Sequence, residues 1–150
     1  MPRAAYQVLV FPFFINDDET IDYALFRRKD ADYWQGIAGG GETGEAVLES
    51  AKRETYEESG IAPESKFIVL DSVASVPVTA FADHALWGKD TLVIPEYSFG
   101  VAASDKNLSL SAEHTEYIWM DYENAVTMLK WDSNKTCLWE LHQRLSCGNS

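Results

Sequence analysis

The sequence predicts an α/β fold in which helices are layered around one sheet. Several short apolar segments rich in β-branched and aromatic residues indicate strands. Apolar residues repeat every three or four positions in the middle and at the end of the chain, which indicates helices. The chain has 150 residues, of which 46% are hydrophobic, and this is enough to bury one core. We therefore expect a single domain over residues 1–150.

The predicted strands are short and are bounded by polar residues or glycine. They cover residues 6–15, 23–28, 67–70, 73–78, 97–103 and 117–120. A polar loop at 29–32 leads into residues 33–38. The glycines at 39–41, together with Gly44, predict a loop with unusual backbone angles. Residues 79–95 are ambiguous and are expected to form a long excursion between two strands.

The predicted helices are defined by apolar stripes and end signals. The first begins at Glu45 and ends at Gly60, a typical C-terminal cap. Its apolar stripe contains Val47, Ala51 and Thr55, with Leu48 beside them. A short helix is capped by Asp121 and runs to about residue 130. A last helix is capped by Ser133 or Asn134, and its buried stripe contains Cys137, Leu138, Leu141 and Leu145.

The chain is strongly acidic, with 12 Lys and Arg against 24 Asp and Glu and a net charge of −12. A polyanion is repelled by a nucleic-acid backbone and by anionic lipid headgroups. The charge therefore argues against a nucleic-acid polymer or a membrane as partner. A small phosphate ester can still bind an acidic protein where metal ions supply the positive charge.

The cysteine content and the apolar segments predict a cytoplasmic protein. Two cysteines, Cys137 and Cys147, are too few for a disulfide framework and are expected to be reduced thiols. The longest apolar run, residues 8–15, is interrupted by Pro12 and is far shorter than the ~20 residues of a membrane span. We expect it to be a buried strand.

Three carboxylates, Glu54, Glu57 and Glu58, lie on one face of the first predicted helix, within an arc of roughly 100°. Like charges at this spacing repel, unless a divalent cation such as Mg²⁺ gathers them, because Mg²⁺ prefers hard oxygen ligands and shares them with phosphates. Arg53 is expected to orient Glu54 through a bidentate pair. The alternative is a solvated acidic face that binds nothing.

The same segment, residues 39–61, resembles the signature of the Nudix hydrolases. The matching positions are Gly39, Glu45, Arg53, Glu54, Glu57, Glu58, Gly60 and Ile61. Thr55 stands where the signature has an aliphatic residue, and a β-branched threonine can fill that buried site. The resemblance implies an α/β/α sandwich with a central mixed sheet. It also implies hydrolysis of a nucleoside diphosphate linked to another group, with Mg²⁺ or Mn²⁺ as cofactor.

The resemblance assigns roles to individual residues. Glu54, Glu57 and Glu58 are implied as metal ligands or general base, and the Ala38 carbonyl as a further ligand. The base is Glu57 or Glu54, and the sequence does not decide between them. Glu45 and Arg53 are implied as supports of the catalytic carboxylates.

A second resemblance is to the group of pyrophosphohydrolases that act on dihydroneopterin triphosphate and dATP. The matching pieces are Arg27-Arg28, residues 32–35, Ala38-Gly39, Glu113-His114, Tyr117, Trp119 and Ser133-Asn134. The group implies that Arg27 and Ala38 contact substrate and that Glu113 binds metal. Diadenosine tetraphosphate hydrolases share the Glu-His, Tyr, Trp arrangement, but they usually carry Pro-Lys-Gly-His where this chain has Ile-Ala-Gly-Gly at 37–40.

Further contacts to a small nucleotide or related polyphosphate are expected around the glycines. Amides of Gly39 and Gly40 can cradle a phosphate. Trp34 can stack on a substrate ring or pack in the core, and His114 can assist proton transfer or be a packed histidine. Residues 77–95 either close over the substrate or form a homodimer contact.

The function expected from these residues is the hydrolysis of a nucleoside or pterin triphosphate to a monophosphate and pyrophosphate. One alternative is a dinucleoside polyphosphate hydrolase. Another is a domain that binds a nucleotide as a sensor without cleaving it, and a third is an acidic interaction protein without a small ligand.

Overall fold

The computed structural model describes residues 3–82, 84–112 and 114–147. A seven-stranded mixed sheet forms the centre of the molecule. Its strands are β1 (Arg3–Ile15), β2 (Ile21–Arg28), β3 (Trp34–Gln35), β4 (Ile37–Glu42), β5 (Phe67–Pro77), β6 (Val93–Ala102) and β7 (His114–Asp121). The helices are α1 (Val47–Ser59), α2 (Tyr122–Met128) and α3 (Asp132–Ser146), with short 3₁₀ turns η1 (Val78–Ala80) and η2 (His84–Trp87).

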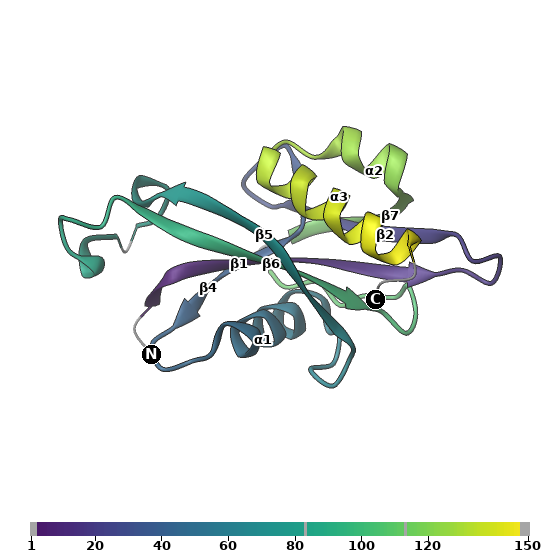
Figure 1. The fold of residues 1–150 in the computed structure, drawn as a ribbon, viewed down its shortest axis with the longest axis horizontal. Coiled ribbons are helices and arrows are strands. Elements are labelled where there is room, and N and C mark those ends of the chain that lie inside the picture. The colour runs from purple at the N-terminus through teal and green to yellow at the C-terminus, as the bar shows by residue number, and fades with distance from the viewer. Residues whose placement is uncertain (1–2, 83, 113, 148–150) are drawn as a thin grey trace.

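Strand β1 is the centre of the sheet. It pairs antiparallel with β2 and β4 and parallel with β6, while β5 follows β6 at the edge. Helix α1 covers one face of this sheet, and α2 and α3 cover the other (Figure 1). The expected α/β/α sandwich with a mixed sheet is confirmed.

The two faces of β1 belong to two separate parts of the core. Leu9, Phe11 and Phe13 pack on the side of α3, whereas Val8 and Val10 pack on the side of α1. Because alternate residues of a strand face opposite sides, a strand covered on both faces is apolar throughout. This explains the uninterrupted apolar run in the sequence, and it confirms the buried strand. No helix in the described part of the chain is long and apolar enough to cross a membrane.

Several predicted boundaries need correction. The two predicted strands at 67–70 and 73–78 form one strand, β5, whose register against β6 shifts between Val69 and Val73. Helix α1 begins at Val47 instead of Glu45, and Leu48, 37% accessible, lies beside the buried stripe. Gly60 caps its C-terminus as predicted, with a φ of 79° and its N–H on the carbonyl of Tyr56.

The predicted cap of the last helix is wrong, whereas that of the short helix is confirmed. Asp121 accepts a hydrogen bond from the Asn124 N–H at the start of α2. Helix α3 begins earlier than predicted, after Trp131, and no side chain caps it. Asn134 is buried within its first turn, where its Oδ1 accepts from the Gly36 N–H at 2.8 Å. The Asn134 side chain therefore binds the backbone just before β4 and does not cap its own helix.

The triple glycine is a strand and not a loop. Residues 39–41 belong to β4 and pair with the first half of β1, and Gly44 is the one glycine in this region with a positive φ, 87°. The reason for glycine here is close approach. A Cβ at Gly39 would overlap the Glu54 carboxyl group, and a Cβ at Gly41 would overlap the Tyr6 ring.

Candidate active site

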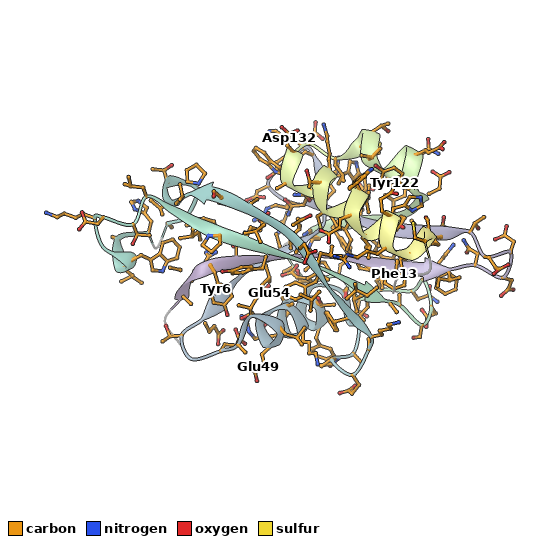
Figure 2. All side chains as sticks on the ribbon, in the orientation of Figure 1. Tyr6, Phe13, Glu49, Glu54, Tyr122 and Asp132 are labelled. Atoms are coloured by element: carbon orange, nitrogen blue, oxygen red, sulfur yellow. The ribbon has the colours of Figure 1, made fainter. Side chains whose placement is uncertain are left out.

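Glu54 is a carboxylate of α1 that lies against strand β4. Its side chain is 13% exposed, and its carboxyl group lies where a Cβ at Gly39 would be. In Figure 2 Glu54 lies on the side of α1 that faces the sheet, whereas Glu49 of the same helix points away from it. Burial raises the pKa of Glu54 to about 7, the nearby Glu57 and Glu58 add to this, and Arg53 opposes it. The backbone of β4 therefore lies directly against the acidic side chains of α1.

Arg53 connects the carboxylates with strand β4. Its Nη1 donates to Glu54 at 2.9 Å and lies 3.4 Å from Glu57, and its Nη2 donates to the carbonyl of Gly40 at 2.9 Å. The expected bidentate pair is with Glu45 instead of Glu54, through Nε and Nη2 at 2.8 and 2.9 Å. Adjacent residues of a helix point about 100° apart, so Arg53 cannot lie flat against its neighbour Glu54.

Glu45 fixes the turn between β4 and α1. Its carboxylate accepts from the Glu42 N–H at 3.1 Å and from the Ser50 hydroxyl at 2.5 Å, in addition to Arg53. The Arg53 guanidinium lowers the pKa of Glu45 to about 2. The Glu45 carboxylate thus compensates the charge of the Arg53 guanidinium and fixes its orientation. This contact agrees in kind with the supporting role that the sequence predicted for both residues.

Glu57 and Glu58 point to different surroundings. The Glu57 side chain is 51% exposed, and its structural partner is Arg53. Glu58 is buried, and its Oε2 lies 2.7 Å from both the Ser111 hydroxyl and Nδ1 of His114. His114 itself is buried against the Phe26 ring. This burial favours the packed interpretation of His114, in which it positions Glu58, over a direct substrate contact.

The remaining predicted residues lie on neighbouring strands. Ala38 of β4 pairs with Leu9 of β1, and Gly40 follows Ala38 two residues later in the same strand. Arg27 and Trp34 are register partners on β2 and β3, and Arg27 forms ion pairs with Glu116 at 2.9 Å and Asp32 at 3.3 Å. Glu113, the predicted metal ligand before β7, lies outside the described residues. The structure therefore brings together the carboxylates around Arg53, and it places Arg27 and Trp34 side by side on β2 and β3.

Carboxylate and carbonyl oxygens are the donors that hard divalent cations prefer. Glu54, Glu57 and the carbonyls of β4 supply such donors, and the raised pKa of Glu54 is the effect that a bound cation would relieve. Within residues 3–82, 84–112 and 114–147, no three His, Cys, Asp or Glu side chains converge on one point. The reason is visible: the Arg53 guanidinium lies between Glu54 and Glu57. These donors are of the kind that a divalent cation prefers, and a bound cation would compete with Arg53 for Glu54 and Glu57.

Comparison with known families decides what this arrangement is. The family model of the NUDIX domain matches residues 6–139, which include most of β1, the glycine strand, α1 and the first half of α3. The chain belongs to the Nudix family. The resemblance seen in the sequence is thereby confirmed.

Several Nudix relatives match three quarters or more of the chain. The asymmetrical bis(5'-nucleosyl)-tetraphosphatase of Rattus norvegicus is 32% identical over 130 residues, 86% of this chain and 84% of the relative. The dihydroneopterin triphosphate diphosphatase of Escherichia coli K12 is 28% identical over 116 residues, 76% of this chain and 77% of the relative. A crystal structure of a NUDIX hydrolase from Listeria monocytogenes superposes with a TM-score of 0.87 at 40% identity, covering 97% of both chains.

These relatives establish the general chemistry. The chain is a Nudix pyrophosphohydrolase, an enzyme that acts on phosphoanhydride bonds. Nudix hydrolases generally depend on a divalent metal ion. The carboxylates of α1 and the guanidinium between them are the described groups of this Nudix domain that suit such a reaction.

Sequence reasoning missed the residues that support the Nudix site from a distance. Ser111 lies 2.7 Å from Glu58, and Tyr6 and Ser50 share a hydrogen bond beside Glu45. Ser50 is buried in α1 at the fourth position before Glu54, so the helical period was the one signal that placed it near the site. No local pattern points to Ser111, because its contact joins residues 53 positions apart.

The raised pKa of Glu54 predicts a pH-dependent stability of this Nudix domain in cation-free buffer. Between the ordinary value of 4.5 and about 7, the unfolded chain releases the Glu54 proton and the folded chain keeps it. The free energy of unfolding should therefore fall as the pH rises through this window, by on the order of 2–3 kcal/mol. Chemical denaturation at pH 5 and pH 8 measures it.

The matched variant for this prediction is Glu54→Gln, which keeps the shape of the side chain and cannot ionise. Its stability should change less than that of the wild type between the two pH values, because the Glu54 contribution is removed. Equal pH slopes for both proteins contradict the assigned pKa shift.

Proposed function

We propose that this Nudix enzyme hydrolyses a nucleoside or pterin triphosphate to a monophosphate and pyrophosphate, with Mg²⁺ as the metal ion and Mn²⁺ as a substitute. The observation that carries the proposal is the site formed by buried Glu54, half-exposed Glu57 and Arg53 under the bare backbone of β4. A polyphosphate can lie against such a backbone, because the glycines present no side chains there.

The described residues can divide the work of hydrolysis. Bound Mg²⁺ would neutralise phosphate oxygens and lower the pKa of the attacking water. Glu57, open to solvent, is suited to accept the proton of that water, with Glu54 as the alternative base. Arg53 holds both carboxylates in place and is itself fixed by Glu45. Glu58 is held by Ser111 and by His114, the first residue of β7, and His114 follows the predicted ligand Glu113 in the sequence.

Substrate contacts on the other strands complete the proposal. The Ala38 carbonyl is a candidate cation ligand, and the amides of Gly39 and Gly40 are candidate phosphate donors. Arg27 is proposed to contact the substrate from β2, and Trp34, its register partner on β3, to contact a substrate ring. The free thiols of Cys137 and Cys147 suit the reducing cytoplasm, where we place the enzyme.

A dinucleoside polyphosphate is the second candidate substrate. The rat tetraphosphatase is 32% identical over 86% of this chain, and the bacterial dihydroneopterin triphosphate enzyme is 28% identical over 76% of this chain. Similarity alone does not separate the two substrate classes. The shared chemistry, attack on a phosphoanhydride bond, is the same in both.

Product analysis on a substrate panel tests the proposal. Nucleoside triphosphates, dihydroneopterin triphosphate and dinucleoside tetraphosphates are incubated with the purified protein and Mg²⁺, and the products are separated by anion exchange. We expect a monophosphate and pyrophosphate from a triphosphate, and no product in EDTA. If only dinucleoside tetraphosphates are cleaved, the result favours the second candidate substrate. Tight binding without any cleavage contradicts both and indicates a nucleotide sensor.

A further inference from the structure

Tyr6 of β1 and Ser50 of α1 form a hydrogen-bond chain that ends on the carboxylate of Glu45. The Tyr6 hydroxyl lies 2.5 Å from the Ser50 hydroxyl and 3.2 Å from the carbonyl of Glu45. The Ser50 hydroxyl in turn lies 2.5 Å from Oε1 of Glu45. Ser50 is fully buried, and the Glu45 side chain is 16% exposed. The chain is therefore largely shielded from water, where hydrogen bonds are strong.

The chemistry of the three groups fixes the direction of this chain. The Arg53 guanidinium keeps the Glu45 carboxylate ionised, so Glu45 can only accept hydrogen bonds. Ser50 has one hydroxyl hydrogen and donates it to Glu45. The Ser50 oxygen is therefore the acceptor in the contact with Tyr6, and the Tyr6 hydroxyl is the donor at which the chain starts.

The Tyr6 ring is held between two other strands of the sheet. A Cβ at Gly41 would overlap this ring, so the ring lies against the backbone of β4. The Tyr97 ring of β6 meets it edge to face, with the ring centres 6.1 Å apart. Gly39 and Gly41 are two positions apart in β4, so Tyr6 and Glu54 approach this strand from the same face. The Tyr6 hydroxyl thus reaches the start of α1 on the side of the site.

The chain ends at the carboxylate that orients Arg53. Glu45 accepts from Nε and Nη2 of Arg53 at 2.8 and 2.9 Å, and its Oε1 accepts from both Nη2 and Ser50. The third nitrogen of Arg53, Nη1, donates to Glu54 at 2.9 Å and lies 3.4 Å from Glu57. A rotation of the Glu45 carboxylate would therefore move the guanidinium relative to both of these side chains.

We propose that Tyr6 and Ser50 are positioning residues of the Nudix reaction. Through Glu45 they fix the orientation of Arg53 and of the two carboxylates that it holds. This inference rests on the proposed function, because it assumes that these carboxylates take part in the hydrolysis. The Nudix signature at 39–61 leaves the position of Ser50 open and does not reach Tyr6. The two hydroxyl groups are therefore an addition of this chain to the support that the signature residues provide.

A double-mutant cycle on the kcat of the best substrate tests the inference. Tyr6→Phe removes the hydroxyl and keeps the ring, and it should lower kcat about 2- to 10-fold with little change in KM, the usual effect of one lost hydrogen bond between neutral groups. Ser50→Ala removes a bond to a charged acceptor and should lower kcat about 10-fold or more. The double variant should have the kcat of Ser50→Ala alone, because Tyr6 acts through Ser50. Tyr97→Phe makes the same change on the neighbouring ring and should leave kcat unchanged.

Two kinetic outcomes overturn the inference: a kcat of Tyr6→Phe equal to that of the wild type, or losses of kcat that multiply in the double variant. A merely structural role of the Tyr6 hydroxyl would lower the melting temperature of Tyr6→Phe and leave its kcat equal to that of Tyr97→Phe.

The Arg53 side chain provides a readout that does not depend on turnover. Exchange of its Nε hydrogen with water is measured by ¹H–¹⁵N NMR in cation-free buffer, and the signal is assigned by its loss in Arg53→Lys. Exchange should be about 2- to 10-fold faster in Tyr6→Phe than in the wild type and faster still in Ser50→Ala, with no further increase in the double variant. If no member of the substrate panel is cleaved, the proposed function fails and these rates still test the hydrogen-bond chain. Equal exchange rates in the wild type and Ser50→Ala contradict the inference.

Discussion

Glu57→Gln should lower kcat about 10²- to 10⁴-fold, the usual contribution of a general base, and leave the fold intact. The Glu57 carboxylate is half exposed beside Arg53, so the substitution removes neither a core contact nor a buried charge pair. An amide of the same shape cannot accept the proton of the attacking water. Steady-state kinetics with Mg²⁺, together with a thermal melt, measure both parts of this result.

The control for Glu57→Gln lies on the same helix. Glu49 accepts a hydrogen bond from the Ala46 N–H at 2.9 Å and points away from the sheet (Figure 2). Glutamine serves this capping contact as well as glutamate does, so Glu49→Gln should keep full activity. Turnover by Glu57→Gln equal to that of the wild type removes Glu57 from the mechanism and leaves Glu54 as the base.

Arg53→Lys should lower both activity and stability, because the ammonium group of a lysine cannot make the several fixed hydrogen bonds of the planar guanidinium. The Arg53 side chain is 24% exposed and bridges Glu45, Glu54 and the carbonyl of Gly40. An ammonium group reaches one or two of these partners at a time. We expect a loss of about 2–3 kcal/mol in the free energy of unfolding and a decrease in kcat of about 100-fold.

Arg144 provides a matched control on the opposite face of the sheet. It donates to Glu140 at 2.8 Å and to Asp71 at 2.9 Å, and Asp71 is 92% exposed. Arg144→Lys should cost about 1–2 kcal/mol, because the Asp71 pair is exposed and the Glu140 side chain is only 14% exposed, and it should leave kcat unchanged. A similar loss of kcat in both variants indicates a general effect of arginine replacement and contradicts the special role of Arg53.

The local pattern of the sequence predicted α1 and its charged face well. The spacing of the Nudix signature places Glu54 and Glu57 on one side of the helix, and Gly60 ends the helix where the signature has glycine. These features depend on helical geometry alone, which is the same in every protein. Arg53 was expected beside Glu54 for the same reason, and a hydrogen bond between them is present.

Contacts between distant segments were not predictable in this way. The bidentate partner of Arg53 is Glu45, because the turn before α1 brings this carboxylate over the first turns of the helix. Residues 39–41 form a strand because they pair with β1, and they are glycines because Glu54, Arg3 and Tyr6 approach them closely. A glycine run is ambiguous between a loop and a close contact until the neighbours are known. No local sequence pattern pointed to the contacts of Arg3, since the Phe81 and Trp87 rings that it touches lie about 80 residues later in the sequence.

The central claim is that the acidic face of α1 is a divalent-cation site that receives a polyphosphate under β4. A crystal structure with Mg²⁺ and a non-hydrolysable nucleoside triphosphate analogue tests it most directly. We predict cation density in contact with Glu54 and Glu57 and analogue phosphates against Gly39 and Gly40. Side chains of Glu54 and Glu57 that stay on Arg53, without an ion and remote from the bound analogue, would contradict the account.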